Sequence, residues 1–216
     1  MAGRGLGRKR KAMENAEKNV ENESVSEPIE PKKEELERIE INRAPVLTLW
    51  VAVVAERQGY AYEEGLSFGK AISGILAHSK GRRLGVYEDK DQQDRKRKTK
   101  QQQKEKEKFD VFGMRIAGQT TKEGTRLALQ NNKPISPVSV ESYLRRAFGP
   151  YYEQGKEAMR ALAKAYPPEK LGSEAYSLYE KIRPQVPGGM KGWGAKGYLD
   201  LNLLHQLQEK EEMLSD

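Results

Sequence analysis

Apolar residues occupy two blocks of this chain, and a fully polar segment separates them. The blocks run from Ala44 to Tyr87 and from Val111 to Leu207, whereas residues 88–108 include no apolar side chain. A core requires apolar patterning, so we expect the two blocks to fold and residues 88–108 to form a charged, flexible insertion. Residues 1–40, rich in Gly, Lys, Glu, Asn and Ser, are expected to form a disordered arm with both basic and acidic residues.

The first block, residues 41–87, has the pattern of a helical hairpin. Pro45 suits the first turn of a helix, and the apolar residues from Val46 to Val54 cover most of its circumference, so this helix should be buried on most sides. Gly59 is placed to end the helix, because glycine readily adopts the left-handed C′ conformation. A second helix is expected from about Glu63 to Ser79.

The second block, residues 109–216, is expected to be helical apart from one short strand or hairpin. Alternating apolar residues favour that strand over Phe109–Ile116. The capping-box pattern Thr120–Glu123 predicts a helix that ends near Asn131, and Ser136-Pro137 predicts the N-cap and first residue of a helix to Phe148. Start and stop signals further along the chain predict three more helices, over about residues 150–166, 168–183 and 201–212.

These patterns predict a mainly α protein without cysteine chemistry or a membrane span. We expect a small domain of about six or seven helices, in which residues 41–87 and 109–216 pack together. The absence of cysteine excludes disulfides, thiol nucleophiles and cysteine-ligated zinc. No apolar stretch approaches the roughly 20 residues that span a bilayer, and no apolar region follows the charged N-terminus, so we expect an intracellular protein with no membrane partner.

The charge of the chain favours a polyanionic partner. The formal net charge is +7 and the isoelectric point is about 9.3, which is typical of many proteins that bind nucleic acid. Two basic tetrads have the composition of nuclear-localisation signals and favour the nucleus over the cytoplasm, although each taken alone is also explained by a solvated charge run. The tetrads are Arg8, Lys9, Arg10 and Lys11, and Arg95, Lys96, Arg97 and Lys98.

Residues 127–146 resemble a helix-turn-helix. A short helix would carry Ala128 on its packed side, Asn131-Asn132 would form the left-handed turn, and the helix after Pro137 would be the recognition helix. Asn132 stands where such motifs usually have glycine, and an ordinary helical hairpin is the alternative. The outward-facing residues that would contact bases or phosphates are Ser139, Ser142, Arg145 and Arg146.

Two further segments carry candidate phosphate contacts. The loop Gly188–Gly197 contains five glycines that let its backbone approach a ligand, two lysines that can neutralise phosphate and a tryptophan that can stack on a base. The tryptophan is equally explained as a core anchor beneath a glycine-rich turn. A basic cluster near residue 80 is explained either by phosphate contact or by solvation of a helix end. The residues concerned are Lys191, Trp193 and Lys196 in the loop, and Lys80, Arg82 and Arg83 in the cluster.

The sequence makes a weak case for an enzyme. Its two histidines, His78 and His205, lie in separate blocks, and carboxylate pairs occur only in charged runs. We therefore assign no catalytic residue, no metal ligand and no cofactor. A site that only the fold assembles is the open alternative.

Three stretches of the two blocks resemble a family of small uncharacterised proteins from bacteria and fungi. They are Arg43–Trp50 (RAPVLTLW), which continues to Val54–Arg57 (VAER), Ser79–Gly85 (SKGRRLG) and Lys191–Leu201 (KGWGAKGYLDL). The resemblance covers both blocks, which implies that they form one unit and that the basic run is an insertion. It implies no activity and carries over no catalytic or binding residue.

The leading hypothesis from the sequence is a non-enzymatic protein that binds nucleic acid. It would use the helix-turn-helix-like segment and the basic clusters, with DNA favoured over RNA. A helical scaffold that binds other proteins is the alternative, and an enzyme ranks third. Salt dependence separates the first two hypotheses, because phosphate contacts make affinity fall steeply as salt rises.

Overall fold

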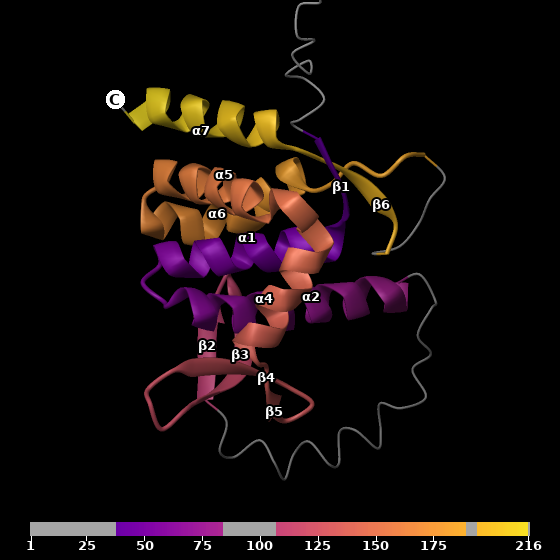
Figure 1. Ribbon diagram of the computed structural model, residues 1–216. Helices are drawn as coiled ribbons and strands as arrows, with labels where there is room; N and C mark the ends of the chain where they lie inside the picture. The colour runs from indigo at the N-terminus through magenta and orange to yellow at the C-terminus, as the bar shows by residue number, and fades with distance from the viewer. Residues whose placement is uncertain (1–37, 84–106, 189–193, 216) are drawn as a thin grey trace, which may run out of the picture. The chain divides into compact units, whose positions relative to one another are not determined.

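Most of the other helices pack against the first helix, and two small sheets lie at different edges of the helical part (Figure 1). The computed structural model describes residues 38–83, 107–188 and 194–215, which all belong to one compact unit. The expected arm and the expected insertion lie outside the described residues, apart from residues 38–40, 107 and 108. The helices are α1 (Arg43–Arg57), α2 (Tyr62–Arg83), α4 (Pro137–Phe148), the short 3₁₀ helix η4 (Gly149–Tyr151), α5 (Tyr152–Ala165), α6 (Pro168–Ile182) and α7 (Leu201–Ser215).

Both sheets are antiparallel. One pairs β1 (Arg38–Asn42), the first strand, with β6 (Lys196–Asp200), the last, with Ile39 opposite Leu199. The other has the order β2-β3-β4-β5. Its strands are β2 (Glu107–Val111), β3 (Met114–Thr120), β4 (Arg126–Gln130) and β5 (Lys133–Pro134).

The prediction of a mainly α fold is wrong. Helices account for 64% and strands for 20% of the interpretable residues, so the protein is mixed α and β. The short strand or hairpin expected around Phe109–Ile116 is a hairpin, in which β2 and β3 are joined by a turn at Phe112-Gly113, both with positive φ. Strand β4 was missed because its segment also carries helix signals, whereas β1 and β6 overlap the ends of the expected arm and of the expected glycine-rich loop.

The expected helix between Thr120 and Asn131 is one of these strands, β4. Thr120, the expected cap, is the last residue of β3. The N–H of the next residue, Thr121, donates to the Thr125 carbonyl (2.8 Å), and its hydroxyl accepts from the Thr125 N–H (3.2 Å). Gly124 has φ +87°, a conformation that glycine adopts without strain. These contacts close a hairpin turn, which sets β4 against β3 with Ala128 opposite Gly118.

The helix-turn-helix prediction fails at the same place. Asn131 and Asn132 adopt the expected left-handed conformation, with φ of 52° and 63°. Two consecutive left-handed residues form a tight hairpin turn, however, and here they join β4 to β5, with Gln130 opposite Lys133. The element before α4 is therefore a strand pair, and α4 has no partner helix of the motif in front of it.

Several helix boundaries predicted from capping residues are confirmed. α4 spans Pro137–Phe148, and the Ser136 hydroxyl accepts from the Ser139 N–H (3.4 Å). The Asp200 carboxylate caps α7 by accepting from the Asn202 N–H (3.0 Å). At the end of α1, Gly59 has φ +93°, and the Tyr60 N–H donates to the Ala55 carbonyl (3.1 Å), which is the six-to-one bond of a Schellman motif.

Helix α1 forms the centre of the core. Every residue from Pro45 to Ala55 is buried, and the helix contacts α2, α4, α5, α6 and β1. Trp50 is fully buried, and its Nε1–H donates to the Ala175 carbonyl of α6 (2.8 Å). The nearly uniform apolar sequence of α1 is explained by this position, because neighbours cover the helix on all sides.

Helices α1 and α2 are in backbone contact along a stripe of small residues. A β-carbon at Gly69 would lie 2.2 Å from the Thr48 carbonyl oxygen, and one at Gly65 would lie 2.6 Å from the Ala52 carbonyl oxygen. One turn further along α2, the Ser73 hydroxyl donates to the Ala44 carbonyl (3.3 Å). The spacing of four residues keeps these small side chains on one face of α2, where the two helix axes can approach closely.

The four-stranded sheet is attached to α2 through a buried carboxylate and a hydroxyl. Glu64 is only 4% exposed, and it accepts hydrogen bonds from the Arg126 N–H (2.7 Å), the Arg126 guanidinium (2.9 and 3.0 Å) and the Ala61 N–H (3.0 Å). The Ser67 hydroxyl accepts from the Ala128 N–H (2.6 Å). Burial alone would raise the pKa of Glu64, but these hydrogen bonds outweigh it and lower the pKa below its ordinary value.

The stripe of small residues gives a first testable prediction. Gly69→Ala should destabilise the protein by about 2 kcal/mol or more, because the added methyl group overlaps the backbone of α1. Gly74→Ala on the same helix is the matched control: the nearest atom to its new β-carbon is at 4.0 Å, and alanine raises helix propensity by up to about 1 kcal/mol. Urea denaturation measures both changes, and equal stabilities for the two variants would contradict the close backbone contact.

The attachment of the sheet predicts a pH dependence. Because the folded pKa of Glu64 is lowered, its contribution to stability is complete above its unfolded value near 4.5 and is lost as the pH falls through the folded pKa. Glu64→Gln should therefore cost about 2 kcal/mol at neutral pH, and its free energy of unfolding should approach that of the wild type in acid. Denaturation curves between pH 7 and strong acid test this, and a cost that does not change with pH would count against the ion pair.

Candidate functional site

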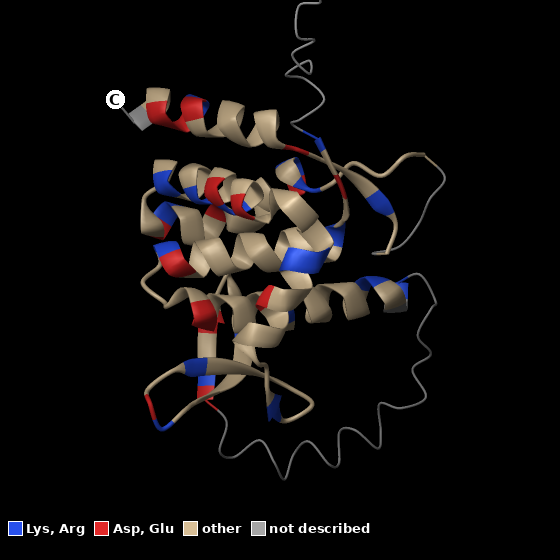
Figure 2. Cartoon of the chain, in the orientation of Figure 1, with Lys and Arg blue, Asp and Glu red and all other residues tan. Residues whose placement is uncertain are grey.

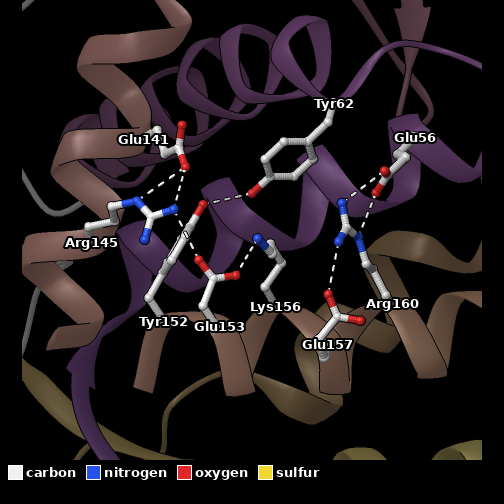
Figure 3. Close-up of polar contacts among 9 residues, drawn as sticks. All are labelled: Glu56, Tyr62, Glu141, Arg145, Tyr152, Glu153, Lys156, Glu157 and Arg160. Atoms are coloured by element: carbon white, nitrogen blue, oxygen red, sulfur yellow. Dashed lines mark hydrogen bonds and ion pairs between the residues drawn. The ribbon is translucent and has the colours of Figure 1, made fainter. Parts of the chain in front are cut away.

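The polar contacts between α1, α2, α4 and α5 form a network of charged side chains and two tyrosines (Figure 3). Arg160 bridges Glu56 (2.8 Å) and Glu157 (2.8 Å). Arg145 bridges Glu141 (2.8 Å) and Glu153 (3.0 Å), and Glu153 also pairs with Lys156. Between the two groups, the Tyr62 and Tyr152 hydroxyls lie 2.9 Å apart.

This network joins the helices and contains no unpaired charged side chain that could bind a ligand. Every carboxylate and cation in it has an opposite partner, and the four carboxylates outnumber the three cations. Burial first, and then the hydrogen bond to Tyr152, raise the pKa of Tyr62, so its hydroxyl stays protonated and cannot serve as a base. A cavity of about 390 Å³ beside Arg160 is lined by Glu56, Glu157 and Arg160 of this network, together with Val53, Arg57, Ala163 and Lys164.

The network changes the role predicted for the α4 residues. Ser139, Ser142, Arg145 and Arg146 are exposed, as the sequence predicted. Arg145, however, pairs with carboxylates on α4 and α5, and its guanidinium lies 4.5 Å from the centre of the Tyr152 ring. Two carboxylates beside this guanidinium repel an approaching phosphate, so Arg145 is less well placed for that role than a cation in a site where cations outnumber carboxylates.

A second site has the opposite charge balance. A pocket of about 460 Å³ lies where the start of α1 meets the ends of α2 and α6, and Figure 2 shows Lys and Arg at the end of α2 that contributes to it. We refer to it as the basic pocket. It is lined by Arg43, Leu76, Ser79, Lys80, Arg83, Tyr176, Tyr179, Glu180 and Arg183.

The basic pocket has an excess of three positive charges. Its lining includes four cations and one carboxylate, Glu180, which pairs with Arg183 (2.9 Å). Burial first, and then the neighbouring guanidinium groups of Arg43 and Arg183, lower the pKa of Lys80. Burial alone would lower the pKa of any lysine, but the contributions of Arg43 and Arg183 show that the excess of cations adds a positive potential at Lys80, which an anion in the pocket would relieve.

Helix ends place these cations. Arg43 is the first residue of α1, and its Nε–H donates to the Pro184 carbonyl (3.3 Å), while the Tyr179 hydroxyl donates to the Arg43 carbonyl (3.3 Å). Lys80 lies in the last turn of α2, and Arg183 caps the end of α6, positions where the helix dipole favours cations. The charges are therefore held by the helix packing.

The structure brings together only part of the predicted set of phosphate-binding residues. Lys80 and Arg83 line the basic pocket, whereas Lys196 lies on β6, 3.7 Å from a carboxylate oxygen of Glu40. The other predicted residues lie outside the part of the chain that the structure describes. They are the Arg82 side chain, Lys191 and Trp193 of the glycine-rich loop, and the tetrads at residues 8–11 and 95–98. The sequence analysis missed Arg43, Arg183 and Tyr176. For the two arginines the one available signal was a cation at a helix boundary, and the tyrosine lies in the middle of α6 without any such signal.

No metal site or membrane-crossing helix is present in the described part of the chain. Its Asp, Glu and His residues form no group of three or more that could hold a metal ion. None of its helices is long and apolar enough to cross a bilayer. The two histidines lie on different helices, His78 on α2 and His205 on α7, and both side chains are exposed.

Comparisons of the chain with protein-family models, with curated proteins and with solved structures found no match. The resemblance to small proteins of bacteria and fungi therefore stays a prediction. The function has to be inferred from the chemistry of the basic pocket.

Proposed function

We propose that this protein is a non-enzymatic nucleic-acid-binding protein and that the basic pocket binds the phosphate backbone. The observation that carries the proposal is the concentration of four cations around one carboxylate in a concave site. Guanidinium groups pair with phosphate through two parallel hydrogen bonds, and ammonium groups add a point charge. Because helix ends hold Arg43 and Arg183 in place, binding phosphate there requires little ordering of side chains.

The rest of the chain supplies sequence-independent attraction in this proposal. The net charge of +7 favours encounter with a polyanion. The basic tetrads at residues 8–11 and 95–98 add phosphate contacts and direct the protein to the nucleus. The helix-turn-helix pattern had favoured duplex DNA, but β4 takes the place of its first helix, so the preference between DNA and RNA becomes an outcome of the experiment.

A second candidate function is a scaffold that binds another protein. Its supporting observation is the pair of apolar side chains at the end of α7, Met213 (79% exposed) and Leu214 (72% exposed). Apolar docking would depend only weakly on salt, in contrast to phosphate binding.

The basic pocket predicts a specific loss of affinity. Lys80→Gln/Arg83→Gln should weaken binding of a labelled oligonucleotide by about tenfold or more, because two charge-assisted contacts are removed. The dependence of log affinity on log salt should become shallower by about 1.4 for a single strand, or about 1.8 for a duplex. Fluorescence anisotropy with DNA and RNA, each single-stranded and duplex, at low and near-physiological salt measures both quantities.

A control with the same net charge separates the pocket from the overall charge. Lys122→Gln/Lys210→Gln removes two exposed lysines outside the pocket and should keep most of the affinity. Deletion of residues 88–108 measures the contribution of that segment. Equal losses in the two double variants would mean that the pocket has no special role, and no binding to any probe at low salt would refute the proposed function.

A further inference from the structure

The basic pocket includes an exposed aromatic ring. Tyr176 lines the pocket and is 45% exposed, whereas Tyr179 on the same helix is buried. Its ring is held by contacts with Phe112 (centroids 6.2 Å apart) and with Tyr179 (6.3 Å). A ring held in this way loses little freedom when a planar ligand stacks on it.

Tyr176 shares one face of α6 with the charged groups of the pocket. Glu180 follows it by four residues and Arg183 by seven, spacings that place all three along one side of a helix. The rise of a helix puts Tyr176 about 10 Å from Arg183 along the axis. A single nucleotide, with its base at one end and its phosphates at the other, can cover that span.

The tyrosine does not oppose an anion. Burial first, and then the carboxylate of Glu180, raise the pKa of Tyr176, so its hydroxyl stays protonated and uncharged at neutral pH. The aromatic wall is therefore neutral, and the positive charge of the pocket comes from the other residues. An aromatic surface beside a cluster of cations is the combination that single-stranded nucleic acid binds in many unrelated proteins.

A duplex fits this arrangement poorly. Its bases are already stacked on each other, so their faces are covered, and the duplex as a whole is much larger than a pocket of about 460 Å³. Extruding one base from a duplex costs a few kcal/mol, whereas a single strand presents its bases without that cost. Stacking of one base on an aromatic side chain contributes about 1–3 kcal/mol.

We infer that the basic pocket binds an unpaired nucleotide, with its phosphates on Arg43, Lys80, Arg83 and Arg183 and its base stacked on Tyr176, so that the protein selects single-stranded over duplex nucleic acid. This inference rests on the proposed function, because it assigns a form of nucleic acid to the same site. It adds a base contact to the phosphate contacts. Substitutions at Tyr176 test the base contact, and Lys80→Gln/Arg83→Gln tests the phosphate contacts.

The experiment compares three substitutions at Tyr176 in the full chain. Tyr176→Ala removes the ring, Tyr176→Leu keeps an apolar side chain against Phe112 without an aromatic face, and Tyr176→Phe keeps the ring. The probes are oligothymidylate of about 12 nucleotides, within the site sizes typical of such proteins, the same length of duplex DNA, oligouridylate, and inorganic polyphosphate as a competitor without bases. Circular dichroism and the melting temperature confirm that each variant is folded.

The expected result is a loss specific to single strands. Tyr176→Ala and Tyr176→Leu should weaken oligothymidylate or oligouridylate binding by about tenfold with an unchanged salt dependence, whereas Tyr176→Phe should stay within about twofold of the wild type. Duplex DNA should bind the wild type more weakly than the single strand and should be almost insensitive to all three substitutions.

Two results would overturn the inference and leave the proposed function intact. One is equal affinity of the wild type for single strand and duplex at the same salt, and the other is equal loss of polyphosphate and oligonucleotide binding in Tyr176→Ala. In both cases Lys80→Gln/Arg83→Gln would still weaken binding, which identifies a site that binds phosphate alone. The absence of binding to every probe would remove the inference and the proposed function together.

Discussion

The close contact between the backbones of α1 and α2 is the constraint on which the other parts of the structure depend. It is possible because glycine and serine occupy every fourth position of α2 where it crosses α1. The antiparallel hairpin that results sets the first residue of α1 beside the last turn of α2, and this arrangement places Arg43 next to Lys80. The other face of α2 is left for the sheet, which attaches at Glu64 and Ser67.

The sequence was a good guide to elements whose boundaries are marked by local chemistry. Ser136, Gly59 and Asp200 cap their helices through contacts within a few residues, so their pattern alone was informative. The segment from Thr120 to Asn131 was mistaken for a helix because its threonines and glutamate satisfy a capping pattern equally well. Its strand form depends on Arg126 and Ala128 bonding to α2, about sixty residues earlier in the chain, and no local pattern records that.

The candidate site was only partly predictable for the same physical reason. Lys80 and Arg83 stood out because they belong to one short basic cluster in the sequence. Arg43, in contrast, is held at the site by a contact with Pro184, 141 residues away. A single arginine at a helix boundary is common, so its position in the sequence did not predict that it belongs to a cluster of cations. Arg145 shows the opposite error: Glu153, the carboxylate that helps to neutralise it, belongs to another helix, and a charge that looked available is already paired.

The crowding of positive groups around Lys80 also has a consequence for its reactivity. Because its pKa is lowered, the Lys80 amine is unprotonated in a larger fraction of molecules at a given pH than the amine of an ordinary surface lysine. Unprotonated amines are the nucleophilic form, so Lys80 should react with acylating agents more readily than an ordinary surface lysine of equal access. Acetylation there would remove one of the four positive charges of the basic pocket. The surroundings that make the pocket attractive to anions thus also favour the reactive, uncharged form of this amine.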